Sequence, residues 1–127
     1  MKADRSFAWS LLAVTVALLS GCANPPPAKP MSFTGTWTNR LGTIWTLKAD
    51  GTFDVDLDHR GKPEAWGRYR VEGDTVIVIG SGGLMPKRCK GEGIYRFHRN
   101  GNTLRFALVR DDCKLRRANL LTTWQRR

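Results

Sequence analysis

The chain has 127 residues, 41% of them hydrophobic, and its 21 Lys and Arg residues against 11 Asp and Glu give a formal net charge of +10. This length suits one domain with one hydrophobic core. A net charge this positive indicates anionic partners, and in a cytosolic protein it would indicate nucleic acid first.

The first 21 residues have the layout of a secretory signal peptide. Lys2 and Arg5 are positive, and an apolar run follows over residues 7–19. A helix that spans a bilayer needs about 20 apolar residues, so this run is too short, and small residues and prolines come after it. A buried core helix is the alternative, but no helical continuation follows. The sequence therefore predicts a signal peptide over residues 1–21, and export argues against nucleic acid as a partner.

A cysteine lies where the apolar run ends, in the stretch Leu19-Ser20-Gly21-Cys22. This stretch resembles the lipobox of bacterial lipoproteins, in which the chain is cut before the cysteine and the thiol carries a diacylglycerol. The resemblance implies a mature chain that begins at Cys22 and is held in the cell envelope by acyl chains such as palmitate, several of which anchor stably. Ala23 replaces the aspartate that often retains such proteins in the inner membrane. This implies the outer membrane, facing the periplasm.

Residues 22–31 carry four prolines and predict a tether. Proline-rich chain favours an extended form of about 3.1 Å per residue, so the tether would lift a domain roughly 30 Å from the bilayer. Residues 32–127 are the predicted domain. Loss of residues 1–21 removes two cations and one carboxylate, which leaves a charge of +9. Outside the cytoplasm this charge favours anionic lipid or acidic envelope polymers, and a solvated surface without a partner is the alternative.

The domain repeats one pattern, a turn dipeptide between two stretches in which apolar and polar residues alternate. Asp50-Gly51, Gly73-Asp74 and Asn100-Gly101 are such dipeptides, and they favour tight hairpins. The sequence predicts an all-β fold, a small up-and-down antiparallel β-barrel of about eight strands, with one or two helical turns near residues 114–120. The predicted strands cover residues 34–39, 43–48, 52–58, 64–72, 75–80, 92–99, 103–110 and 120–126.

Gly35-Thr36-Trp37 opens the first predicted strand and resembles the Gly-x-Trp motif that opens lipocalins and related calycin barrels. The resemblance implies that Trp37 closes the barrel base and that Arg126 or Arg127 packs over it. The later chain is also similar to small bacterial lipocalin-like proteins, many of them secreted or lipid-anchored. The domain is much shorter than a typical lipocalin, which implies little room for a ligand. The residues that match in order are Asp111, Cys113, Arg117, Leu120 or Leu121, and Trp124.

Two cysteines remain once Cys22 is assigned to lipid. Exported proteins meet an oxidising compartment, so Cys89 and Cys113 are predicted to form a disulfide, worth about 3 kcal/mol on the chain-entropy model. A metal site is the alternative, but further ligands with suitable spacing are lacking. The bridge would gather cations that suit phosphate and carboxylate oxygens. These candidate anion-binding residues are Lys87, Arg88, Lys90, Lys114, Arg116 and Arg117.

A barrel of this size is filled by side chains or holds one small ligand. The first hypothesis is a membrane-anchored envelope lipoprotein whose barrel binds a small amphiphilic or anionic, lipid-like ligand. The alternative is an envelope interaction, structural or inhibitor protein with a filled barrel and no small-molecule ligand. The candidates for the interior are Trp37, Trp45, Phe53, Trp66, Tyr69, Tyr95, Phe97, Phe106 and Trp124.

Asp54, Asp56 and Asp58 share one face of a predicted strand. A straight strand spreads them too far apart for the cage of about six to eight oxygens that Ca²⁺ needs, so cross-strand pairs with Arg68 and Arg70 are expected instead. No group of serine, histidine and carboxylate indicates catalysis. The sequence therefore predicts no enzyme activity, no metal and no cofactor.

Overall fold

The computed structural model describes Gly21 and residues 33–127. Cys22, the tether of residues 22–31 and the predicted signal peptide apart from Gly21 lie outside the described residues. Residues 33–127 form one closed β-barrel. In this part of the chain, no helix has the length and apolar character needed to cross a membrane.

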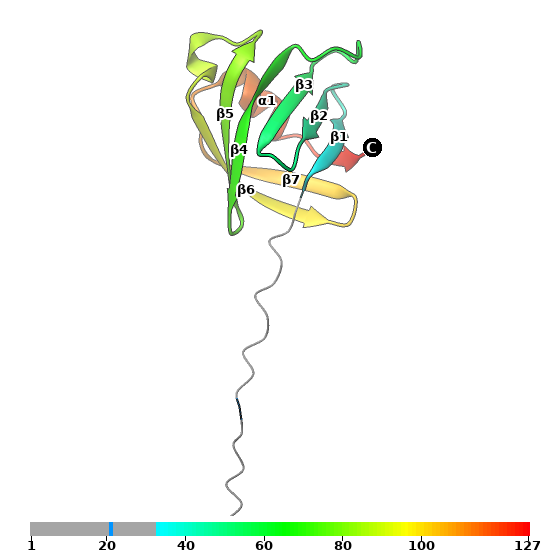
Figure 1. The fold of residues 1–127 in the computed structure, drawn as a ribbon, viewed down its shortest axis with the longest axis vertical. Coiled ribbons are helices and arrows are strands. Elements are labelled where there is room, and N and C mark those ends of the chain that lie inside the picture. Colours follow the sequence, from blue (N-terminus) through cyan, green and yellow to red (C-terminus); the bar gives the residue numbers. More distant parts are fainter. Residues whose placement is uncertain (1–20, 22–32) are drawn as a thin grey trace, which may run out of the picture.

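Eight antiparallel strands pair in chain order, and β8 returns to pair with β1 (Figure 1). This confirms the predicted all-β, up-and-down barrel. One α-helix, α1, spans Lys114–Leu120, and one short 3-10 helix, η1, spans Lys87–Cys89. The strands are β1 Gly35–Asn39, β2 Ile44–Leu47, β3 Thr52–Asp56, β4 Ala65–Glu72, β5 Thr75–Gly83, β6 Glu92–Asn100, β7 Thr103–Arg110 and β8 Trp124–Arg126.

The prediction of a last strand over residues 120–126 is wrong for the first half of that range. Leu120 is the final residue of α1, and β8 begins only at Trp124. The helix starts after Cys113, whose Sγ accepts a hydrogen bond from the Arg116 amide at 3.2 Å, as the side chain of a helix N-cap does. The helical turns predicted near residues 114–120 are therefore confirmed, and they shorten the strand that follows.

The up-and-down order places alternate connections at opposite ends of the barrel (Figure 1). The open end, which carries η1 and α1, is made by four connections, residues 40–43, 57–64, 84–91 and 111–123. The closed end is made by three short turns, residues 48–51, 73–74 and 101–102.

Phe33 plugs the closed end. Its ring lies 4.7 Å from that of Phe97 and 5.8 Å from that of Tyr69, centroid to centroid. The Phe33 carbonyl accepts a hydrogen bond from Trp37 Nε1 at 2.7 Å. Because Trp37 is fully buried, this bond satisfies a donor that would otherwise be costly to bury.

Arg126 covers Trp37 from the end of β8. Its guanidinium carbon lies 5.5 Å from the centroid of the Trp37 ring, and its Nη2 donates to the Thr34 carbonyl at 3.2 Å. Gly35 has φ of +129°, and a methyl group there would come within 2.9 Å of Arg126 Nη2. Arg99 approaches the same indole at 5.5 Å. Glycine, indole and guanidinium thus close this end of the barrel together.

The core fills the barrel interior with large side chains. All strands, the core cluster and the disulfide described below lie within residues 33–127, so this part contains the interactions that a domain needs to fold by itself. The buried cluster consists of Phe33, Trp37, Trp45, Leu47, Phe53, Val76, Val78, Tyr95, Phe97, Leu104, Phe106, Leu120 and Trp124.

Replacement of Arg126 tests the closed end. Arg126→Met removes the cation from the Trp37 ring and the hydrogen bond to Thr34, so we expect the free energy of unfolding to fall by about 1 kcal/mol. Denaturant unfolding of residues 32–127 measures it. Arg127→Met is the matched control, since only its backbone amide bonds to the barrel, at Thr36. Equal losses in the two variants would contradict the role of Arg126.

Candidate functional site

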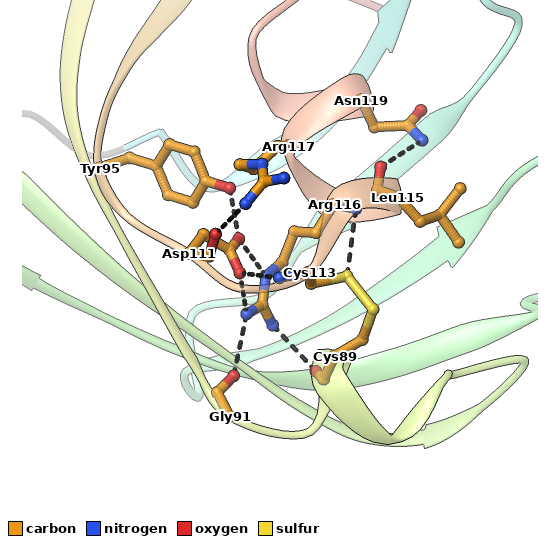
Figure 2. Close-up of a disulfide and its surroundings, with 9 residues drawn as sticks. All are labelled: Cys89, Gly91, Tyr95, Asp111, Cys113, Leu115, Arg116, Arg117 and Asn119. Atoms are coloured by element: carbon orange, nitrogen blue, oxygen red, sulfur yellow. Dashed lines mark hydrogen bonds and ion pairs between the residues drawn. A yellow bond between two sulfur atoms is a disulfide. The ribbon is translucent and has the colours of Figure 1, made fainter.

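A disulfide joins Cys89 to Cys113 at the open end and confirms the predicted pairing. Cys89 ends η1 in the β5–β6 connection, and Cys113 immediately precedes α1. The two Cα atoms lie 4.6 Å apart. The bridge therefore fastens the loop after β5 to the helix before β8 (Figure 2).

Asp111 lies beside the disulfide and is only 4% exposed. Its carboxylate accepts hydrogen bonds from Arg116 Nε at 2.6 Å, from Arg116 Nη2 at 2.7 Å and from the Cys113 amide at 2.8 Å. The Tyr95 hydroxyl, from β6, donates to the same carboxylate (Figure 2). Both carboxylate oxygens are thus satisfied, as burial of a charge requires.

The hydrogen bonds determine the ionisation of Asp111. Burial acts to raise the pKa of its carboxyl, but hydrogen bonds from Arg116, Tyr95 and the Cys113 amide outweigh burial and hold the pKa below its usual value. Burial, followed by the hydrogen bond to Asp111, raises the pKa of Tyr95. The phenol therefore remains a donor, and Asp111 is the charged partner of Arg116 at neutral pH.

Two of the six candidate anion-binding residues turn towards this network. The Arg116 side chain is 11% exposed, and besides Asp111 it donates to the carbonyls of Cys89 at 3.0 Å and Gly91 at 2.9 Å. Arg117 Nη1 donates to the Asp111 carbonyl. The structure thus commits both guanidinium groups to protein oxygens.

The other four candidates lie on the surface around the disulfide. Lys87, Arg88, Lys90 and Lys114 are exposed, and in the described part of the chain none of them forms an ion pair. Three flank Cys89 and one follows Cys113, so the bridge does bring their backbones together. We call these four residues the basic rim.

An apolar cavity of about 80 Å³ opens beside the basic rim at the open end of the barrel. Trp45 and Trp124 line it from the strands, Leu84 and Met85 from the β5–β6 connection, and Leu115 from α1. Sequence reasoning singled out this connection for its cations and missed the two apolar residues. The signal for them was the pair of bulky apolar residues among glycines in the run from Gly80 to Gly93.

Trp45 borders the cavity with an unsatisfied donor. It is buried, and its Nε1 has no hydrogen-bond partner among the described residues. The rings of Phe53, Phe106 and Trp124 surround it at centroid distances of 6.0, 5.7 and 5.5 Å. An aromatic face is a weak acceptor for N–H, and an unpaired buried donor costs about 1–3 kcal/mol.

Most of the predicted interior residues are buried, with two departures. Tyr69 is partly buried and packs against the core. The prediction for Trp66 was wrong. Its side chain is 45% exposed and lies on the outer face of the barrel, against Gly82 of β5. A methyl group at Gly82 would come within 2.7 Å of Trp66 Nε1. The inward neighbour is Gly67, whose missing side chain makes room for the Phe53 ring.

The acidic row does not form the expected pairs with Arg68 and Arg70. The register of β3 and β4 sets Thr52 opposite Arg68, so Asp54 pairs instead with Lys48 at 2.8 Å. The buried Asp56 accepts from the amides of Arg60 at 3.1 Å and Gly61 at 2.7 Å. Carboxylate oxygens of Asp56, Asp58 and Glu64 lie within 4.8 Å of one another. Asp56, the most buried of the three, already accepts hydrogen bonds from two backbone amides. These hydrogen bonds stabilise the conformation of the β3–β4 connection.

No protein-family model, curated protein or solved structure matches this chain. The closed eight-stranded barrel is compatible with a lipocalin-like fold.

Acid titration tests the Asp111 network. A carboxyl with a lowered folded pKa stabilises the fold above its unfolded pKa, near 3.8, and this stability is lost as pH falls through the folded pKa. We expect Asp111→Asn to lower the free energy of unfolding by about 3 kcal/mol at neutral pH. The difference from the parent should narrow below about pH 4.

Denaturant unfolding across the acid range measures this difference. The matched control is Asp112→Asn, which alters the adjacent exposed carboxyl and should leave the free energy of unfolding at neutral pH close to that of the parent. A gap between parent and Asp111→Asn that stays constant down to the lowest pH would show that the ionised carboxylate is not what stabilises the open end.

Proposed function

We propose that this protein binds a small anionic amphiphile at the open end of its barrel. The apolar part of the ligand enters the cavity, and its head group meets the basic rim. The observation that carries the proposal is that the apolar cavity is lined by Pro86, Cys89, Cys113 and Leu115, the immediate sequence neighbours of the four exposed cations of the basic rim. Ligand sites are typically concave and apolar, with a few polar groups that fix orientation.

The cavity volume limits how much of a ligand it holds. A dry apolar cavity of about 150 Å³ takes up benzene, whereas this one is about 80 Å³. It therefore suits the last few carbons of a chain. The rest of the ligand would cross the mouth near Leu84 and Leu115, which are both exposed and part of the lining.

The charge of the rim supports an anionic head group. Exposed ion pairs contribute only about 0.2–1 kcal/mol each, so the four cations favour an anion by their number and proximity. Arg116 also lines the cavity, but its guanidinium is engaged by Asp111 and by backbone carbonyls, and Arg117 Nη1 is engaged by the Asp111 carbonyl, so we assign the head group to the four exposed cations. The proposed head-group contacts are therefore narrower than the sequence alone implies.

The setting of this activity is the cell envelope. The signal-type segment over residues 1–21 and the lipobox-like stretch that ends at Cys22 support a lipid-anchored protein of the outer membrane. The disulfide agrees with an oxidising compartment. An envelope interaction or structural protein without a ligand is the second candidate, and the largely filled interior favours it.

Titration with decanoate and with decylammonium tests the proposal. Both carry the same chain and opposite head charges, and the emission of Trp45 and Trp124 at the cavity reports occupancy. We expect decanoate to bind residues 32–127 more tightly. Lys87→Glu with Lys90→Glu should weaken it by about tenfold, and Ala65→Leu, which fills the cavity at a lining position, should weaken both probes.

Matched controls lie on the outer face of β7. Arg105→Glu changes an exposed cation and Ala107→Leu enlarges an exposed alanine, and neither residue borders the cavity. Both should bind decanoate as the parent does. Equal affinity for the two probes, or full affinity in Ala65→Leu, would rule out this site and favour the ligand-free candidate.

A further inference from the structure

Exposed leucines concentrate at the open end of the barrel. Leu41, Leu84, Leu115 and Leu121 are between 44% and 65% exposed, and they come from three of the four connections there. The remaining exposed large apolar side chains among the described residues lie on the barrel wall, in β4 and β7. No such residue lies in the three turns of the closed end. Scattered exposed leucines are ordinary, but this concentration at one end marks a contact surface.

Charge follows the same division between the two ends. The four connections of the open end carry nine Lys and Arg against four Asp and Glu, whereas the three closed-end turns carry one against two. Most of the open-end cations are exposed. Leucines and exposed cations therefore share one surface. The turns of the opposite end carry one lysine and no exposed large apolar residue, and Arg99 and Arg126 at that end lie over the Trp37 ring. The open-end cations are Arg40, Arg60, Lys62, Lys87, Arg88, Lys90, Lys114, Arg116 and Arg117.

We propose that the open end docks on an anionic lipid surface, with its leucines at the level of the head groups and its cations against the phosphates. Interfacial binding combines buried apolar area with attraction to anionic lipid, and each Lys or Arg near such a surface adds about 1 kcal/mol. A soluble polyanion would satisfy the cations and leave the leucines in water. Both features together favour a lipid surface.

The cavity opens within this docking surface. Leu84 and Leu115 belong both to the exposed leucines and to the cavity lining. An amphiphile in the lipid layer would thus reach the cavity without crossing water, so docking names the source of the proposed ligand. Docking itself does not depend on the proposed function, because Leu41 and Leu121 do not border the cavity.

Flotation with vesicles tests docking. Residues 32–127 are mixed with phosphatidylcholine vesicles, with or without phosphatidylglycerol. We expect partitioning onto the anionic vesicles at least about tenfold stronger than onto the neutral ones, and weaker partitioning as salt rises. Leu41→Ser with Leu121→Ser should weaken partitioning by about fivefold or more, and Lys87→Glu with Lys114→Glu by about tenfold or more.

Matched controls come from the barrel wall. Leu108→Ser with Val109→Ser removes two equally exposed apolar side chains, and Arg96→Glu with Arg105→Glu reverses two exposed cations of β6 and β7. We expect the apolar wall variant to bind vesicles as the parent does. The charge-reversed wall variant should lose less vesicle binding than the variant Lys87→Glu with Lys114→Glu. Near-ultraviolet circular dichroism checks folding, and the single variants Leu41→Ser and Leu121→Ser replace the double variant if it unfolds.

Three outcomes would overturn the inference. These are equal partitioning onto both kinds of vesicle, undiminished binding by the open-end leucine variants, and losses in the wall variants as large as those at the open end. Decanoate titration of Leu41→Ser with Leu121→Ser separates this inference from the proposed function. That variant should keep its affinity for decanoate while it loses vesicle binding.

Discussion

The buried ion pair of Asp111 and Arg116 is the interaction on which the open end depends. A single guanidinium binds the carboxylate with two nitrogens and also reaches the carbonyls of Cys89 and Gly91. It thus ties together the loop after β5, the end of β7 and α1. Burial of two charges repays its desolvation cost only when the remaining lone pairs and protons are satisfied. Here Tyr95 and the Cys113 amide complete the set.

This pair also decides which cations remain exposed at the open end. The disulfide brings the backbones of six basic residues from two segments into one region of the structure. Asp111 and backbone carbonyls nevertheless engage Arg116 and Arg117. The lysines and Arg88 remain at the surface. Arginine suits the buried role because its planar fork holds several oxygens at fixed angles, whereas lysine is a compact, hydrated charge on a flexible stem. One local network therefore serves stability and leaves a separate set of charges exposed to solvent.

Local patterns in the sequence predicted most of the fold but did not predict the cavity. The alternation of apolar and polar residues, together with the turn dipeptides, predicted the strands. The expected export to an oxidising compartment predicted the disulfide. Trp66 was misplaced because its hydrophobicity was weighed above its position, although it shares the parity of Arg68 and Arg70. The partners of Asp54 depended on strand register, which sequence alone did not fix. The cavity arises where residues from several strands, a loop and α1 meet, so no single segment contains its signal.

The two ends of the barrel differ in how completely side chains fill them. Aromatic rings and Arg126 fill the closed end, and an eight-stranded barrel has little interior to spare. The proposed ligand would therefore enter at the open end, where loops on a rigid scaffold typically carry binding residues. Leu84 and Leu115 line the cavity and are exposed at its mouth. The proposed docking surface and the proposed ligand site therefore share these two side chains, whereas Leu41 and Leu121 belong to the docking surface alone.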